Sequence, residues 1–328
     1  MICPPGKRHA RRLKATPIIR SPGRAPGSTV APVSYEHPLA YLLGLEGLAL
    51  LRGFTGEFDR GFTEARIAEV RGLLGDESLA HTAVEVDRVE TVAGYRLWAE
   101  TYDSPGNTAF SLDEPAVNRI LDTLPPGTAL DAACGTGRYA HWLAERGHRT
   151  IGVDSSPEML ARARTRVPPG RFLLGDLHRL PVAGSAVDLV VCGLALTHVP
   201  ALTPVLAEFA RVLRPGGHLV LADVHPEAVA RGSIPPVRGP GGRPGRVVSH
   251  HHRIGDYLRA ALGVGLHLRG CEEPRLPVRA GADRPAAVDV GPWDVWPWSL
   301  AALVPEAARA ANEDVPAMVI WHFQLAGR

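Results

Sequence analysis

The sequence predicts an α/β fold: a three-layer sandwich around a mostly parallel sheet, with a helical addition at the N-terminus. Three observations carry this prediction. The apolar run at 129–132 turns through glycines into a helical segment, the run at 149–153 ends at Asp154, and the run at 172–174 is followed by Asp176. In a parallel sheet the carboxyl ends of the strands share one edge, which is where α/β proteins bind ligands.

The glycines after the first strand predict that a ligand approaches the backbone closely. Gly135 and Gly137 lack a side chain and can adopt a positive φ, so a ligand can lie directly against the turn. The run from Gly135 to Ala140 also matches the dinucleotide pattern G-x-G-x-x-G/A. Asp131, however, stands four residues before Gly135. Its carboxylate would repel a pyrophosphate and attract a positively charged ligand.

Composition limits the class of protein. The 328 residues are 45% hydrophobic and 21% charged, which is typical of a globular protein. No apolar run approaches the roughly 18 residues of a membrane span, so we expect no membrane partner. The four cysteines are scattered and form no C-x-x-C pair. This pattern predicts reduced thiols, a cytoplasmic location and no metal site.

The charge is unevenly distributed along the chain. The net charge is +2, but the first 32 residues hold seven Lys and Arg and no acid. The remainder has 29 basic and 34 acidic residues, a balance of −5. Affinity for nucleic acids comes largely from neutralised phosphates, so we expect no nucleic-acid partner.

Three segments follow from these patterns. Residues 1–32 are rich in Arg, Pro and Gly and predict a disordered basic tail or translated upstream sequence. Residues 33–90 predict a helical unit, because leucines recur there at helical spacing. This unit has two open interpretations, a homodimer contact and a roof over the active site. Residues 91–328 form the predicted main domain, within which residues 226–249 are expected to be a loop rich in Pro, Gly and Arg.

Four motifs within about residues 94–225 resemble the class I S-adenosylmethionine (SAM)-dependent methyltransferases, of the type that acts on small molecules. They are Y-x-x-W-A-x-x-Y-D from Tyr95, D-x-x-C-G-T-G from Asp131, G-D-x-x-x-L-P from Gly175, and V-L-R-P-G-G-x-L-V from Val212. The resemblance implies a Rossmann-like sheet of seven strands in the order 3-2-1-4-5-7-6, with the last strand antiparallel. It also implies SAM as the cofactor.

The cofactor side of the predicted site lies at the first three strand ends. The carboxylate of Asp154 can accept hydrogen bonds from both ribose hydroxyls. The resemblance implies that Asp176 accepts a hydrogen bond from the adenine amino group and that Leu177 packs on the adenine ring. The resemblance also implies a lid over the cofactor formed by the segment from Tyr95 to Tyr102. The predicted cofactor-binding residues are Tyr95, Asp131, Cys134, Gly135, Thr136, Gly137, Asp154, Ser155, Asp176, Leu177, Cys192 and Gly193.

The acceptor side is predicted at the ends of strands 4 and 5, for a small molecule or short peptide. His198 is a candidate general base, because the pKa of a histidine suits neutral pH. The alternative is that it is simply a packed side chain. The predicted catalytic residues are His198 and Tyr102, and the predicted substrate-binding residues are Tyr102, His198, His252 and Trp296. Two alternatives remain: an NAD-dependent oxidoreductase, disfavoured by Asp131 and Asp176, and a non-catalytic partner subunit with this fold.

Overall fold

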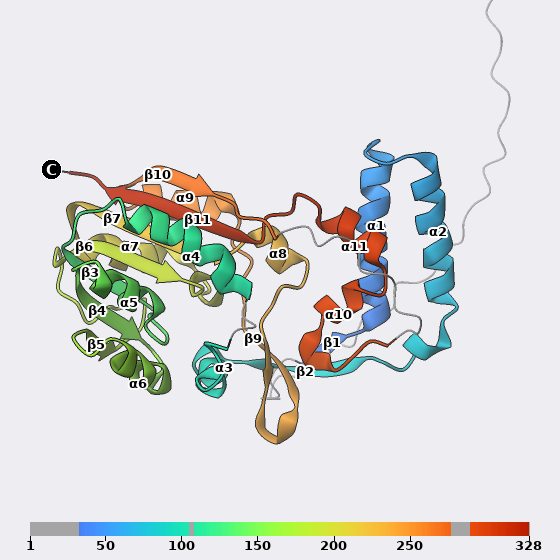
Figure 1. The fold of residues 1–328 in the computed structure, drawn as a ribbon, viewed down its shortest axis with the longest axis horizontal. Coiled ribbons are helices and arrows are strands. Elements are labelled where there is room, and N and C mark those ends of the chain that lie inside the picture. The colour runs from blue at the N-terminus through green and yellow to red at the C-terminus, as the bar shows by residue number, and fades with distance from the viewer. Residues whose placement is uncertain (1–32, 105–107, 277–288, 328) are drawn as a thin grey trace, which may run out of the picture. The chain divides into compact units, whose positions relative to one another are not determined.

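The computed structural model describes residues 33–104, 108–276 and 289–327, so the predicted tail at 1–32 lies outside the described residues. Its main element is a seven-stranded sheet (Figure 1). In spatial order its strands are β10 (Leu266–Glu272), β11 (Met318–Leu325), β7 (Leu213–Val224), β6 (Val187–Gly193), β3 (Thr128–Ala132), β4 (Arg149–Asp154) and β5 (Arg171–Leu174). Strand β11 runs antiparallel to both of its neighbours, β10 and β7, and the remaining pairs are parallel. The predicted order 3-2-1-4-5-7-6 is therefore confirmed.

Helices cover both faces of this sheet and make it the middle of three layers. Buried side chains of α4 (Thr108–Leu121), α5 (Arg138–Glu145) and α6 (Pro157–Arg166) pack on one face. Those of α7 (Leu202–Val212) and α9 (Ile254–Leu262) pack on the other. The parallel strands are buried on both faces, which agrees with the apolar runs from which they were predicted.

A second hydrophobic cluster joins residues that are far apart in the sequence. Helix α1 (Pro38–Phe54) packs against α2 (Arg60–Leu74), and also against α10 (Trp298–Ala301) and α11 (Pro305–Asn312). Figure 1 shows these four helices side by side, away from the large sheet. The cluster thus contains residues from both sides of the predicted boundary at residue 90. The domain boundaries themselves stay a prediction.

A small four-stranded sheet corrects one prediction. Residues 226–249 read as a Pro- and Gly-rich loop, but the segment contains α8 (Pro226–Ala230) and two strands. The strand order is β1 (Val33–Glu36), β2 (Val84–Val89), β9 (Pro244–Val247), β8 (Pro236–Arg238). The loop prediction was wrong because β9 is stabilised by parallel pairing with β2, a partner about 150 residues earlier that leaves no local signal.

Helix α3 (Thr91–Trp98) leads from the small sheet to the edge of the large one. It begins directly after β2, and its Gly94 packs against Val247 of β9. The indole Nε1 of Trp98 donates a hydrogen bond to the carbonyl oxygen of Pro236, at 3.2 Å. The small sheet therefore fixes the position of α3.

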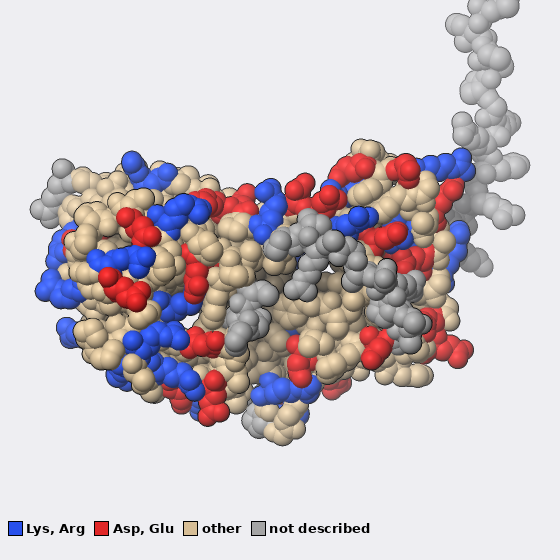
Figure 2. All heavy atoms as spheres, viewed as in Figure 1, with Lys and Arg blue, Asp and Glu red and all other residues tan. Residues whose placement is uncertain are grey.

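The surface shows charges of both signs. On the face drawn in Figure 2, acidic and basic side chains of the described residues are interspersed over most of the surface. The absence of a nucleic-acid partner stays a prediction. None of the helices in the described ranges has both the length and the apolar character needed to cross a bilayer.

The contact between α3 and β9 gives a first prediction. A Cβ added at Gly94 would lie 2.5 Å from Cγ2 of Val247, so Gly94→Ala forces the helix away from the sheet. Overpacking of this kind costs about 1–3 kcal/mol of unfolding free energy. Urea denaturation should show this loss in the wild-type background and a smaller loss when Val247→Ala is already present. Equal losses in both backgrounds would show that the clash does not matter.

Candidate functional site

The loop between β3 and α5 has an unusual backbone. Ala133, Gly135 and Gly137 have φ angles of 56°, 53° and 82°. Two carboxylates hold this conformation: Asp131 accepts from the N–H of Ala140 at 2.8 Å, and Asp154 accepts from the N–H of Gly135 at 2.7 Å. Glycines are favoured at positions 135 and 137 because residues with a side chain rarely adopt such φ values without strain.

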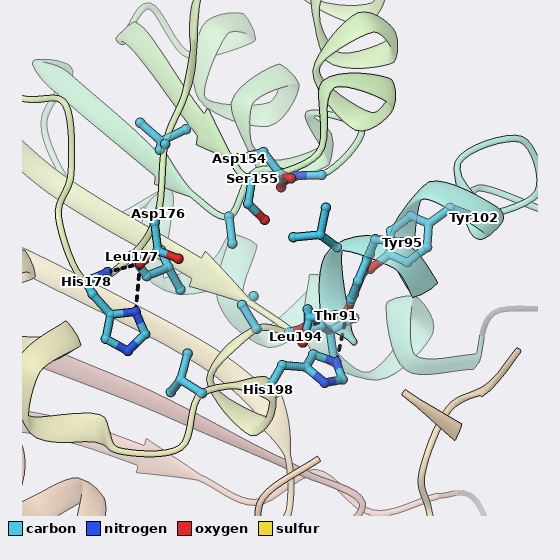
Figure 3. Close-up of a pocket in the computed structure, with 18 residues that line it drawn as sticks. Thr91, Tyr95, Tyr102, Asp154, Ser155, Asp176, Leu177, His178, Leu194 and His198 are labelled. Atoms are coloured by element: carbon cyan, nitrogen blue, oxygen red, sulfur yellow. Dashed lines mark hydrogen bonds and ion pairs between the residues drawn. The ribbon is translucent and has the colours of Figure 1, made fainter. Parts of the chain in front are cut away.

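A cavity lies over this loop at the carboxyl ends of β3, β4, β5 and β6 (Figure 3). Figure 3 shows Asp154 and Ser155 near one end, Asp176 nearby, and Tyr95 with His198 at the other end. Nine predicted site residues line it: Tyr95, Tyr102, Gly135, Asp154, Ser155, Asp176, Leu177, Gly193 and His198. The sequence prediction missed other lining residues, among them Thr91, Ala133, His178, Leu194 and Val199.

Asp154 is placed to receive a ligand with hydroxyl groups. Its two oxygens accept from the backbone N–H groups of Gly135 and Ser156, at 2.7 and 2.8 Å. Burial raises the pKa of Asp154, and these backbone hydrogen bonds oppose that rise by stabilising the carboxylate. Each carboxylate oxygen retains a second lone pair, so the side chain can still accept two hydrogen bonds from the cavity.

At the other end of the cavity, Tyr95 and His198 form a dyad. The Tyr95 hydroxyl lies 3.1 Å from Nε2 of His198 and 3.1 Å from the carbonyl oxygen of Leu194. Nδ1 of His198 lies 2.7 Å from the carbonyl oxygen of Val248. A carbonyl only accepts, so this contact places a proton on Nδ1. In the neutral ring Nε2 then carries the free lone pair, which suits a proton acceptor.

A second cavity of about 440 Å³ adjoins the first. Four residues line both cavities: Tyr95, Tyr102, Leu194 and His198. This volume lies within the range of small-molecule sites. The dyad therefore stands in the wall between two adjoining cavities.

The segment leading to Tyr102 is fastened over the glycine loop. Thr136 donates its hydroxyl proton to Asp103 at 2.8 Å, and Arg166 of α6 donates to both side chains, at 2.9 and 2.8 Å. Thr136 is buried and does not line the cavity, so its predicted cofactor contact is corrected to this fastening role. A Cβ at Gly135 would lie 3.9 Å from the Tyr102 ring, which places that ring over the loop.

Four more predicted cofactor residues lie behind the cavity wall. Asp131 is 2% exposed and faces Ala140, because it holds the first turn of α5. Gly137 faces Ala163 of α6, which a Cβ would meet at 3.1 Å. Cys134 and Cys192 are buried in the hydrophobic clusters, where burial raises the pKa of both thiols well above its usual value. These residues lie at the predicted strand ends and in the predicted glycine loop, but none of them lines the cavity.

Two predicted substrate residues are also corrected. His252 is buried and its Nε2 lies 2.8 Å from the carbonyl oxygen of Val199, so it holds the turn after β6 and lines neither cavity. Trp296 is 3% exposed in the helical cluster, and its Nε1 donates to the carbonyl oxygen of Val290. Trp298, 55% exposed, lines the second cavity instead.

Asp223 was missed as a site residue although it carries the same signal as the other acids. It lies near the end of β7, is 1% exposed, and lines the second cavity.

Within the described residues, no three His, Cys, Asp or Glu side chains converge as they would around a metal ion.

Comparison with known proteins agrees with this geometry. A methyltransferase-domain family model matches residues 130–221. An uncharacterized methyltransferase of Emericella nidulans is 30% identical over 233 residues, which cover 58% of this chain and 81% of the relative. A malonyl-[acyl-carrier protein] O-methyltransferase of Pectobacterium atrosepticum is 36% identical over 114 residues, 34% of this chain and 45% of the relative. The structure of a SAM-dependent methyltransferase from Mesorhizobium loti is 24% identical, with a TM-score of 0.46, covering 64% of this chain and 96% of that chain.

The chain belongs to the class I SAM-dependent methyltransferases. It is an enzyme with SAM as its cofactor, so the NAD-dependent and non-catalytic alternatives are set aside. The match spans about half the length of the malonyl-carrier relatives, 45% for the Pectobacterium protein and 53% for that of Serratia marcescens.

The position of Asp154 predicts its contribution to cofactor affinity. Asp154→Ala should weaken SAM binding about ten- to a hundredfold, because hydrogen bonds to a charged acceptor contribute roughly 1.5–3 kcal/mol each before water compensates. Isothermal titration calorimetry measures this loss. Asp188→Ala, at the opposite end of the sheet beside Thr128, is the matched control and should leave SAM affinity unchanged. Unchanged affinity in Asp154→Ala would remove the ribose assignment.

Asp131 predicts a dependence of stability on pH. Burial raises its pKa to about 7, above the usual 3.8, so its contribution to stability is present below about 3.8 and lost as the pH rises through 7. Asp131→Asn lacks this titration. The melting temperature of the variant, relative to the wild type without SAM, should therefore rise between pH 5 and pH 8. A difference that stays constant over this range would show that Asp131 does not titrate there.

Proposed function

We propose that the enzyme transfers the methyl group of SAM to a small molecule held in the second cavity. The observation that supports this most directly is the shared wall, because Tyr95, Tyr102, Leu194 and His198 line both cavities. Two substrates of a transfer reaction must meet in line, and adjoining cavities with a common wall bring them together.

The residues of the first cavity fit SAM. Asp154 has free lone pairs for the ribose, Asp176 lines the same cavity, and the backbone at Gly135 is open to close approach. When bound, SAM supplies a methyl group that its positively charged sulfur has already activated. The protein's own task is to align the acceptor and exclude water, for which Tyr102 is fastened over the loop through Asp103.

His198 is the proposed general base. Its Nδ1 proton is directed at Val248, so Nε2 is the nitrogen that can take a proton from the acceptor. When the Tyr95 hydroxyl donates to Leu194, the Nε2 lone pair is available to the acceptor. Burial raises the pKa of Tyr95 well above its usual value, so this hydroxyl stays protonated and serves to orient the histidine.

A carrier-bound malonyl group, which the names of two relatives state as their acceptor, is a second candidate. It would bring a carboxylate into a cavity whose described lining contains Asp223 and no arginine or lysine. The same cavity is open to a small molecule that carries a hydroxyl or amine. We therefore favour the free small molecule as the acceptor.

The base assignment predicts a loss of turnover without a loss of cofactor. His198→Gln keeps a polar side chain but cannot act as a base, so the methylation rate should fall about a hundredfold or more. Release of S-adenosylhomocysteine (SAH) measures the rate on a panel of hydroxyl-, amine- and carboxylate-bearing acceptors, and calorimetry should show SAM affinity within threefold. His267→Gln, on the edge strand β10, is the control. An unchanged rate in His198→Gln would refute the base.

A further inference from the structure

The second cavity combines a broad apolar wall with very little charge. Trp98 and Trp298, together with Ile234, Pro235 and Met318, contribute apolar surface to it. Flat aromatic side chains of this kind pack well against planar or bulky apolar ligands. The cavity therefore suits an acceptor with an aromatic or apolar body.

The charged groups around this cavity have one sign. Among its described lining residues there is one carboxylate, Asp223, and neither arginine nor lysine. His198 is the basic side chain of this lining, but with its one proton on Nδ1, directed at Val248, the neutral ring carries no positive charge. Among the described lining residues, a negatively charged acceptor would therefore meet a carboxylate and no arginine or lysine to neutralise it.

Burial raises the pKa of Asp223, and the hydrogen bonds from Thr197 and Val224 oppose that rise by stabilising the carboxylate. Oδ2 accepts from the N–H of Thr197 at 2.6 Å, and Oδ1 accepts from the Thr197 hydroxyl at 2.5 Å and from the N–H of Val224 at 2.8 Å. Three donors aimed at two oxygens stabilise the carboxylate, although burial acts in the opposite direction. Because the side chain is 1% exposed, solvent screens its field only weakly.

We propose that Asp223 makes this cavity selective for uncharged or cationic acceptors with an aromatic or apolar body, and that it excludes carboxylates. This inference rests on the proposed function, since it describes the acceptor cavity of that reaction. Asp223 acts mainly through its field, because its side chain is 1% exposed and its two oxygens already accept three hydrogen bonds from Thr197 and Val224.

A matched pair of ligands tests the proposal by binding alone. The enzyme is saturated with SAH and titrated in a calorimeter with 6-hydroxy-2-naphthamide and with 6-hydroxy-2-naphthoate, which differ in charge but hardly in size. The amide should bind at least about tenfold tighter, because like charges repel strongly at the low effective dielectric of a buried site. The aminomethyl analogue, a cation, should bind at least as tightly as the amide.

Variants then identify the source of the selectivity. Asp223→Asn removes the charge and should reduce the amide-to-acid affinity ratio about tenfold, a change that mere loosening of the fold would not produce. Asp188→Asn is the matched control, because this carboxylate accepts from Thr128 at the opposite end of the sheet, and should leave the ratio unchanged. Ser233→Arg adds a cation to the lining of the folded wild-type cavity and should also lower the ratio. It decides the question if Asp223→Asn does not fold.

The outcomes separate the two proposals. Failure of the enzyme to bind SAH would count against the proposed function. If SAH binds but the naphthoate binds as tightly as the amide, or none of the three aromatic probes binds at millimolar concentration, the selectivity proposal is overturned. It is also overturned if the ratio is unchanged in both a folded Asp223→Asn protein and Ser233→Arg.

Discussion

The geometry of the site depends on two buried carboxylates that accept hydrogen bonds from the same loop. Asp131 holds the N–H of Ala140 at the first turn of α5, and Asp154 holds the N–H of Gly135. Together they maintain a turn in which three residues have positive φ. Buried N–H groups must find an acceptor, so the strand ends supply one for each. The remaining lone pairs of Asp154 can then accept hydrogen bonds from the ligand, whereas Asp131 is buried and does not line the cavity.

Much of the large sheet could be predicted from the sequence, because its signals are local. Each central strand is a short apolar run, and the runs at 149–153 and 172–174 are followed by an acid at Asp154 and Asp176. The order of all seven strands followed from the resemblance and is confirmed. The small sheet could not be predicted in the same way. Strands β8 and β9 are short and begin with Pro, and the pairing of β2 with β9 joins segments about 150 residues apart.

The candidate site shows the same division between local and tertiary information. Tyr95, Tyr102 and His198 were predicted from motif positions and line both cavities. Trp296 and Trp298 are two residues apart, and a sequence pattern cannot tell which one faces a cavity. Packing decides it: Trp296 lies in the cluster with α1 and α11, which leaves Trp298 at the cavity.

The two cavities also differ in what holds their walls. Beyond α3 and Tyr102, the cofactor cavity is built on the ends of the large sheet, whose geometry is set by strand pairing and by the Asp154 contact. The second cavity, which we propose holds the acceptor, takes residues from α3, the 233–236 segment and α10, elements fixed by the small sheet and the helical cluster. Changes in those outer elements can therefore reshape the acceptor cavity while the sheet ends stay in place. Asp223 differs from these residues because, like Val224 and Met318, it belongs to the large sheet. Its charge is therefore the feature of that cavity that is least able to vary with the outer elements.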